Sequence, residues 1–330
     1  MTAAQSSAST VPLGRRVRVR VPATSANLGP GFDALGLALA RYDVLEVRAL
    51  GNGDVVVDVE GEGAGEVPGD ERHLVVRALR AALELVGAPQ TGLHLTCTNA
   101  IPHGRGLGSS AAAVVAGIAA ARALVADPAA LDDAAVLQLA TEFEGHPDNA
   151  APAIYGGATI AWTSTVEGRE GAHAVRLDVH PDIEATVLVP STRLATSRAR
   201  GVLPQTVPHA DAALNAGRAA LLVDALTRSP QHLFEATEDR LHQEYRAGVM
   251  TASWELVRAL RLDGLAATIS GAGPTVLLLG RAQDREHADA VLRELLHGSD
   301  LWRAYRPGID LEGVRSERVV GSTGLPASMR

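Results

Sequence analysis

Alternating and helical runs of apolar residues predict strands and helices in mixed order along the chain. Val17, Val19 and Val21 alternate with arginines, which is typical of a half-exposed β-strand. Residues 74–86 carry apolar side chains at helical spacing, and Gly87 follows as an expected helix end. In the first half, the pattern predicts further strands at residues 43–48, 54–59, 91–98 and 155–162, and helices at 111–126 and 131–143.

The second half repeats the mixture of strands and helices on a smaller scale. Residues 163–171 are polar and charged, so we place a domain junction there, near residue 165. Residues 239–246 have the composition of a charged connector. The pattern predicts strands near 174–179, 185–189, 265–269, 275–279 and 301–305, and helices at 209–227, 231–234, 251–260 and 284–296. This order indicates a small α+β layer. The expected division is a disordered tail at 1–14, domains at 15–165 and 166–310, and a C-terminal tail at 311–330.

Three glycines at alternating positions and two serines lie directly before an alanine-rich helix. Gly104, Gly106 and Gly108 allow the backbone to turn sharply and to approach a ligand closely. Ser109 or Ser110 would cap the helix. Unpaired N–H groups and the helix dipole at such a position attract an anion. The stretch is therefore either an anion-binding loop or an ordinary turn before a helix, and the rest of the chain must decide between them.

Three other segments combine turn residues with polar side chains. Residues 22–33 form a long Gly/Pro/Ser/Asn-rich loop that contains Asn27 and Asp33. Residues 142–149 hold three carboxylates, an amide and an imidazole, which is too polar for a core. Residues 191–200 carry three arginines. Each segment can be explained as loop or solvated helix end, but each also carries groups that recognise polar ligands.

Composition excludes several classes of function. Among 330 residues the 30 basic ones are all arginine, and the net charge is −8. The absence of lysine excludes a Walker A phosphate loop, the protein-kinase fold and Schiff-base chemistry through lysine. The negative charge argues against nucleic acid or an anionic membrane surface as partner. The N-terminus lacks a signal-peptide pattern and no apolar run reaches membrane-spanning length, so we expect a cytoplasmic protein.

Cys97 is the single cysteine of the chain, so neither a disulfide framework nor a cysteine zinc site is possible. It lies in an alternating segment, residues 93–97, that is typical of a strand. A buried filler position is favoured over a reactive thiol.

These motifs together resemble those of the GHMP small-molecule kinases. The phosphate-binding signature of that family, Pro-x-x-x-Gly-Leu-Gly-Ser-Ser-Ala-Ala, stands without a mismatch at residues 102–112, and its late Gly-rich motif stands at 270–274. Four further segments are similar to the homoserine kinase branch: residues 22–33, 144–152, 196–204 and 242–246. The resemblance is colinear from about Val17 to Leu279. Glu244 replaces the proline usual in the branch, and roughly the last 20 residues match nothing we can name.

The resemblance implies an α+β fold of two domains, with an N-terminal domain like domain 2 of ribosomal protein S5 and a ferredoxin-like C-terminal domain. It implies that the protein phosphorylates L-homoserine with ATP and Mg²⁺, which is a step of threonine biosynthesis. It also implies a homodimer. ATP and acceptor would meet in the cleft between the domains. The expected ATP-binding residues are Pro102, His103, Gly104, Arg105, Gly106, Leu107, Gly108, Ser109, Ser110, Ala111 and Ala112.

The resemblance also implies roles for residues outside this loop. Arg200 and Arg246 would hold the homoserine carboxylate, and a guanidinium does so bidentately. Ser110 and Glu144 would bind Mg²⁺, whereas Glu142 points elsewhere on helical spacing. The candidate substrate-binding residues are Asn27, Asp33, Asp148, Asn149, Arg200, Arg246 and Gly271, and the candidate catalytic residues are Asn149, Asp148 and Thr196.

Two alternatives stay open at this level. Asp148 could remove the hydroxyl proton, but a loose phosphoryl-transfer transition state demands little of a base, so direct transfer with Asn149 orienting the hydroxyl is favoured. A non-catalytic nucleotide or amino-acid sensor on the same fold is the second hypothesis. A sensor has no need to keep Ser110 and Glu144 together with a full set of acceptor-binding residues.

Overall fold

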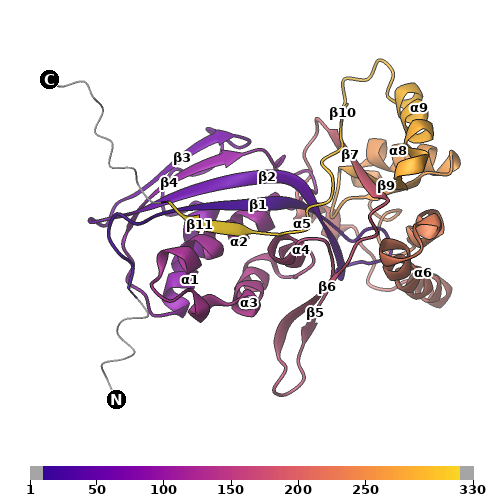
Figure 1. The fold of residues 1–330 in the computed structure, drawn as a ribbon. Coiled ribbons are helices and arrows are strands. Elements are labelled where there is room, and N and C mark those ends of the chain that lie inside the picture. Colours follow the sequence, from indigo (N-terminus) through magenta and orange to yellow (C-terminus); the bar gives the residue numbers. More distant parts are fainter. Residues whose placement is uncertain (1–9, 320–330) are drawn as a thin grey trace.

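The computed structural model describes residues 10–319, which form two β-sheets with helices packed on them (Figure 1). The first sheet has seven strands and the second has four. The predicted α+β class is therefore confirmed. No helix within the described part of the chain is long and apolar enough to cross a membrane.

The first sheet is built around the long strand β2, which pairs on both sides. Its order is β11-β1-β2-β4-β3, and β5 pairs with the start of β2 and carries β6 on its other side. All pairs are antiparallel except β3 with β4. The strands are β1 (Arg16–Ala26), β2 (Leu35–Leu50), β3 (Val55–Gly61), β4 (Gly92–Asn99), β5 (Ala158–Ser164), β6 (Gly171–Leu177) and β11 (Arg315–Arg318).

Four helices cover one face of this sheet (Figure 1). They are α1 (Leu74–Leu85), α2 (Ser109–Leu124), α3 (Asp133–Glu144) and α4 (Ala150–Tyr155), with a 3₁₀ turn at Pro128–Leu131. α2 lies between the others and is buried on nearly every side, because its alanines allow close approach; Gly117 sits directly against the backbone of α1. This packing holds the N-terminus of α2 at the edge of the core, where the Gly-rich loop precedes it.

The second sheet is antiparallel, with the order β10-β7-β9-β8 of a ferredoxin-like domain. Its strands are β7 (Ile183–Pro190), β8 (Ala266–Ile269), β9 (Val276–Arg281) and β10 (Trp302–Tyr305). The helices are α5 (Thr196–Gly201), α6 (His209–Thr227), α7 (Leu233–Ala236), α8 (Thr251–Leu262) and α9 (Arg285–Leu295), with 3₁₀ turns at Pro230–His232, Ala247–Val249 and Ala282–Asp284. One core continues from the first sheet onto β7 and α6, and a second fills the space between this sheet, α8 and α9.

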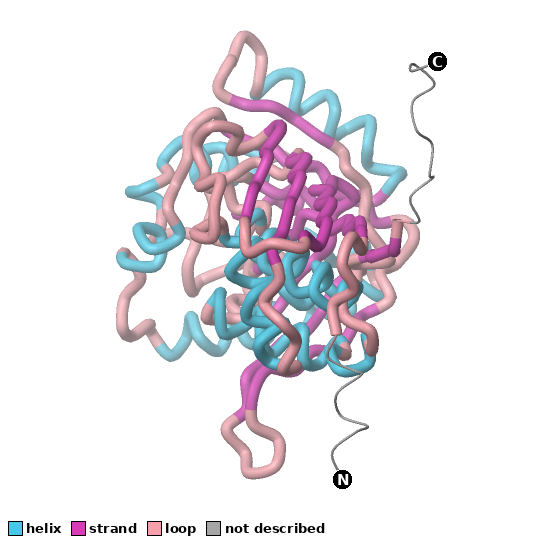
Figure 2. Tube along the Cα trace, turned by 90° about the vertical axis from the view of Figure 1, so that its left-hand side faces the viewer, coloured by secondary structure: helices cyan, strands magenta, loops and turns pink. Residues whose placement is uncertain are grey.

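The domain junction predicted near residue 165 is wrong. Residues 163–171 are the end of a β-hairpin in which β5 and β6 pair from Ala158–Leu177 to Ser164–Gly171, and Figure 2 shows this hairpin projecting from the body. The chain changes sheet only after β6, at residues 178–182. The polar composition that suggested a linker comes from the exposed turn of the hairpin.

Both predicted tails also differ from the structure. Residues 1–9 and 320–330 lie outside the described residues, but residues 10–14 contact the first sheet and its core: Val11 is buried and the Gly14 N–H donates to Ala49 O at 3.0 Å. At the other end, Arg315–Arg318 forms β11 and pairs with β1. This segment therefore completes the first sheet instead of forming a tail.

Three shorter predictions need correction for a common reason, namely that tertiary contacts override local composition. Tyr155 ends α4, so the strand predicted from it begins only at Ala158. Residues 35–42, which carry no predicted strand, are the first half of β2. Half of the charged connector predicted at 239–246 is buried, where its polar groups bind one another and neighbouring backbone.

Candidate active site

The Gly-rich loop at residues 102–108 turns into α2 through left-handed glycines. Gly104, Gly106 and Gly108 have φ values of 63°, 76° and 67°. A Cβ on Gly106 would meet the carbonyl oxygen of Ser270, and one on Gly108 would meet Thr24 Oγ1. Glycine is required at these two positions both for the backbone conformation and for the close packing of the loop.

Three other segments hold this loop through its carbonyl groups. Thr24 N–H donates to Leu107 O (3.1 Å), Leu194 N–H to Gly104 O (2.9 Å) and Thr275 N–H to Arg105 O (3.2 Å). Among the described residues, no acceptor is found for the backbone N–H groups of residues 104–110. The loop thus offers a set of free N–H donors at the start of a helix, which is an anion-binding arrangement.

The acidic segment after α3 faces this loop. Ser110 Oγ donates to Glu144 Oε1 at 2.6 Å, which joins the first turn of α2 to the last residue of α3. Glu142 instead accepts a hydrogen bond from Gln138 Nε2 (2.9 Å) on the same helix, as helical spacing predicts. Burial raises the pKa of the Glu144 carboxyl, although the Ser110 hydroxyl opposes this shift.

His146, Asp148 and Asn149 form a chain of contacts behind Glu144. His146 Nδ1 lies 2.6 Å from Asp148 Oδ1, and this hydrogen bond raises the pKa of His146 despite its partial burial. Asn149 Nδ2 donates to Asp148 Oδ1 at 3.4 Å, and Thr24 Oγ1 donates to Asn149 Oδ1 at 2.8 Å. The Thr24 contact fixes the amide so that its NH₂ group lies on the Asp148 side.

Two arginines from the second domain lie opposite this acidic segment and differ in their partners and burial. Arg200 is bound by both carboxylate oxygens of Asp33, with Nη2–Oδ1 at 2.7 Å and Nη1–Oδ2 at 3.2 Å, and this contact raises the pKa of Arg200. Arg246 is 1% exposed and, among the described residues, makes no ion pair. Burial and the charge of Arg200 lower the pKa of Arg246 to about 10. Arg246 is therefore a buried cation available to an anionic ligand.

Asn27 and Gly271 connect the loops of the two domains at the same place. Asn27 Nδ2 donates to Gly271 O at 2.8 Å, and Asn27 Oδ1 accepts from Asp33 N–H at 2.9 Å. Asn27, Leu28 and Asp33 all have positive φ, at 69°, 49° and 56°. Asn and Asp tolerate this conformation, whereas Leu28 is strained and is held by its fully buried side chain.

These groups line a cavity of about 320 Å³ between the domains. It is lined by Asn27, Gly104, Gly106, Gly108, Ser109, Ser110, Phe143, Glu144, His146, Asp148, Asn149, Leu194, Thr196, Arg200, Arg246, Gly271 and Ala272. Sequence analysis does not name Phe143, Leu194 or Ala272 as site residues, since an apolar side chain carries no chemical signal, even for Ala272 within the 270–274 motif. Asp33, which binds Arg200, lies outside the lining.

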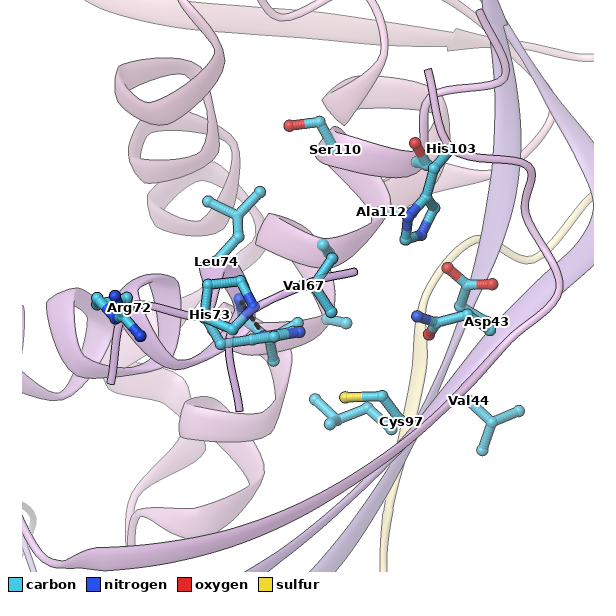
Figure 3. Close-up of a pocket in the computed structure, with 17 residues that line it drawn as sticks. Asp43, Val44, Val67, Arg72, His73, Leu74, Cys97, His103, Ser110 and Ala112 are labelled. Atoms are coloured by element: carbon cyan, nitrogen blue, oxygen red, sulfur yellow. Dashed lines mark hydrogen bonds between the residues drawn. The ribbon is translucent and has the colours of Figure 1, made fainter. Parts of the chain in front are cut away.

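A second cavity, of about 340 Å³, opens on the other side of Ser109 and Ser110 (Figure 3). Its walls come from β2, β4, α1, α2 and the loop before α1, and they are mainly apolar. It is lined by Asp43, Val44, Leu45, Val67, Pro68, Arg72, His73, Leu74, Val75, Cys97, Asn99, His103, Ser109, Ser110, Ala112, Ala113 and Ala116. Of the predicted ATP-binding residues, His103 and Ala112 lie here, while Pro102 and Arg105 line a separate small pocket and Leu107 and Ala111 are buried.

Burial shifts the pKa values of four groups that line the second cavity. Burial lowers the pKa values of His73 and His103, and it raises the pKa of the Cys97 thiol to about 12; the predicted burial of Cys97 is confirmed. Burial also raises the pKa of Asp43 to about 6, although its Oδ1 accepts from the N–H groups of Ala100 and Ile101 at 2.7 and 2.8 Å. A flat, weakly polar group would fit such walls.

The loop at residues 61–73 lines this cavity and is joined to the second domain by an ion pair. Val67, Pro68 and His73 line the cavity, and Glu66 in the same loop binds Arg193 with Oε2–Nη1 at 2.5 Å and Oε1–Nη2 at 3.1 Å. Arg193 precedes Leu194, which lines the first cavity. The two cavities thus share both the start of α2 and a link between their outer loops.

Family models and relatives agree with this geometry. The model of the GHMP kinases N terminal domain matches residues 73–157, and that of the GHMP kinases C terminal domain matches residues 212–298. The chain is 56% identical over 298 residues to the homoserine kinase of Streptomyces coelicolor, covering 90% of this chain and 93% of that one. It is 50% identical over 320 residues to the homoserine kinase of Clavibacter michiganensis, covering 97% and 99%.

The chain belongs to the homoserine kinase family of the GHMP kinases. Among solved structures, it is similar to the crystal structure of homoserine kinase from Cytophaga hutchinsonii, with a TM-score of 0.79, 26% identity and coverage of 92% of this chain and 97% of that one. The GHMP kinase fold predicted from the motifs is confirmed. In this fold the Gly-rich loop lies where the two domains meet, and it separates the two cavities.

Proposed function

We propose that the protein transfers the γ-phosphoryl group of ATP to the hydroxyl group of L-homoserine. The observation that carries the proposal is the position of Ser109 and Ser110, which line both an apolar cavity and a polar one. A nucleotide whose base occupies the apolar cavity must pass its phosphates over the free N–H groups at the start of α2. Its terminal phosphate would then lie at the entrance to the polar cavity.

The polar cavity has the charges that an amino-acid acceptor needs. Arg246, with Arg200 beside it, is a cationic site for the carboxylate, and arginine binds a carboxylate in a planar, bidentate manner. For the ammonium group, the buried carboxylate of Asp148 lines the cavity, whereas Asp33 would need to share or release Arg200. Asn27 and Gly271 would support this end of the acceptor. A hydroxyl group at the other end would face Asn149 and Thr196.

Mg²⁺ fits the donors at the entrance. Ser110 and Glu144 supply a hydroxyl and a carboxylate oxygen in direct contact, both hard ligands, and phosphate oxygens and water would complete the shell. In the described part of the chain no cluster of three His, Cys, Asp or Glu side chains offers a closed metal site, which agrees with a metal that arrives with the nucleotide. When bound, Mg²⁺ would neutralise charge on the transferring phosphate.

The chain's own groups act mainly by position and charge. Thr24 holds the Asn149 amide, and Asn149 orients the acceptor hydroxyl. The hydroxyl oxygen forms a bond to the γ-phosphorus as the bond to the bridging oxygen of ADP breaks, and the hydroxyl proton leaves to solvent. Asp148 is already bound to His146 and Asn149, so we favour direct transfer over removal of the proton by Asp148.

A coupled assay of ADP release tests this function. L-homoserine should support turnover with Mg²⁺, whereas mevalonate and a panel of other hydroxy compounds should not. Turnover with another acceptor in place of homoserine would assign the chain to a sister activity of the GHMP kinases. Binding of ATP without turnover on any acceptor would favour the sensor hypothesis.

Two finer features belong to the same proposal. We place the enzyme in the cytoplasm, where ATP is available. We also expect a homodimer, which the family resemblance implies, and light scattering of the purified protein would establish its mass in solution.

A further inference from the structure

His242 is a fully buried histidine that the proposed reaction leaves without a role. It lies in the segment between α7 and α8, and its exposed fraction is 0%. Its two ring nitrogens contact two different parts of the acceptor region. Nδ1 lies 3.0 Å from Nη1 of Arg246, and Nε2 lies 2.8 Å from the carbonyl oxygen of Gly29.

These contacts determine the protonation state of the ring. Arg246 has only N–H donors, so Nδ1 of His242 must accept, and Nε2 must carry the proton that it donates to Gly29 O. Burial lowers the pKa of His242, and the positive charge of Arg246 adds to this effect. The contacts require the neutral ring with its proton on Nε2.

Arg246 is held from one side by this histidine and by two backbone carbonyls. Its Nε donates to Ala199 O at 3.1 Å, and its Nη1 donates to Gly271 O at 3.3 Å as well as to His242. No partner for Nη2 is found among the described residues, and Arg246 lines the polar cavity. The three acceptors thus fix the plane of the guanidinium and leave one of its edges to a ligand.

The same ring also supports the loop opposite Arg246. Phe32 stacks on His242 with ring centroids 5.1 Å apart, and the guanidinium carbon of Arg246 lies 5.6 Å from the centre of the Phe32 ring. Asp239 fixes the turn that carries His242 by accepting from the N–H groups of Leu241, His242 and Gln243. His242 is therefore held by its own segment while it holds Arg246 and packs on the 27–33 loop.

We propose that His242 is a positioning residue that selects acceptors with a carboxylate by fixing Arg246. The inference rests on the proposed function, because it assumes that Arg246 binds the carboxylate of homoserine. His242 itself does not line the cavity and does not touch the acceptor. A ring that only filled space would give the same packing without affecting the choice of acceptor.

Two substitutions separate these roles. His242→Phe keeps a ring against Phe32 but removes both hydrogen bonds. His242→Asn loses the ring but places an amide oxygen where Nδ1 lies, so it can still accept from Arg246. The acceptors are L-homoserine and 3-aminopropan-1-ol, which has the same hydroxyl and amine but no carboxylate. The readouts are kcat and KM for each acceptor and for ATP, and calorimetric binding of homoserine in the presence of ADP.

We expect His242→Phe to raise the KM for homoserine by ~10- to 100-fold, as for loss of a hydrogen bond to a charged group, with little change in the KM for ATP. The preference for homoserine over 3-aminopropan-1-ol should fall by a similar factor. His242→Asn should keep most of that preference.

Other outcomes overturn the inference. If His242→Phe keeps the wild-type preference, or if His242→Asn is the worse of the two, His242 acts through packing alone. An equal loss of kcat/KM for both acceptors and for ATP would indicate general damage to the enzyme. That result would also contradict the positioning role. Failure of the wild-type enzyme to phosphorylate homoserine would instead remove the proposed function itself, so the two failures are distinguishable.

Discussion

The two cavities beside the start of α2 are similar in size but are built in different ways. The apolar one takes its walls from several segments that meet only through folding, and its contacts are mostly van der Waals. The polar one is formed by short motifs whose side chains are bound to one another before any ligand arrives, as in Ser110–Glu144, Thr24–Asn149 and Asn27–Gly271. We expect the apolar cavity to select a ligand by its shape. We expect the polar cavity to select a ligand by the charge and orientation of its polar groups.

This difference predicts unequal tolerance to substitution. A cavity that recognises shape loses affinity in proportion to the volume changed, whereas a preorganised polar site fails when one group is removed. Substitutions on either side of Ser109 and Ser110 therefore test whether the two regions are as distinct as their construction indicates.

The largest effect is expected at Glu144. Glu144→Ala should lower kcat by ~10²- to 10³-fold, because it removes the carboxylate that would hold Mg²⁺ at the transferring phosphate. The matched control is Glu142→Ala, which removes a carboxylate two residues away that, within residues 10–319, is seen to bind Gln138 alone, and it should leave kcat within about twofold. Steady-state assays over a range of Mg²⁺ concentrations measure both. Equal losses in the two variants would contradict the assignment of Glu144.

A second prediction concerns the loop that separates the cavities. Gly108→Ala should lower kcat by ~100-fold, because the new Cβ displaces Thr24 and with it Asn149. Gly145 has a similar backbone, with φ of 82°, but an added methyl group there would meet only open space, so Gly145→Ala should cost only about 1 kcal/mol of stability. Activity assays and denaturant unfolding of both variants separate the effect of the steric clash at Gly108 from the effect of backbone strain alone.

A third prediction contrasts the two substrates. Arg246→Met should raise the KM for homoserine by ~100-fold and leave the KM for ATP nearly unchanged, since it removes the cation from the polar cavity. Ala113→Leu places a larger side chain in the apolar cavity and should raise the KM for ATP by only ~10-fold. If either variant changes both KM values equally, the two cavities do not divide the substrates as proposed.

The smallest effect concerns stability and pH. Because burial raises the pKa of Glu144 in the folded state, protonation of this group favours folding below the ordinary pKa of glutamate. That contribution is lost as the pH rises through the folded-state value. Glu144→Gln, which stays uncharged, should therefore have a higher Tm than the wild type at pH 7, with the difference shrinking toward pH 4. A lower Tm at pH 7 would show that Glu144 is stabilising there.

The sequence is informative where chemistry needs a fixed order of residues. The motifs indicate the 102–112 loop, the Glu144–Asn149 segment and Gly271, and the structure brings part of each, including the loop's three glycines and two serines, around one cavity. A motif also indicates Arg246, although its segment has the composition of a charged connector. The burial of Arg246 depends on Ala199, Gly271 and His242, which come from three separate segments.

Apart from the motif residues at its edge, the apolar cavity could not be predicted, because its apolar wall residues have no chemical signature of their own. Val67, Cys97 and Ala116 are ordinary apolar residues until the loop before α1, β4 and α2 bring them together. The misplaced domain junction has a related cause. A polar hairpin turn and an interdomain linker have the same composition, and only the pairing of β5 with β6 separates them.

The pairing of β11 with β1 has a consequence for synthesis of the protein on the ribosome. The first strand of the chain receives its outer neighbour from residues 315–318, and Asp310 is buried where its side chain accepts from the hydroxyl of Tyr42 and the N–H groups of Glu312 and Gly313. The first sheet is therefore incomplete until residues 315–318 have left the exit tunnel. The nascent chain must carry an unpaired edge of β1 while the second domain is translated, and the emergence of residues 315–318 completes the first sheet.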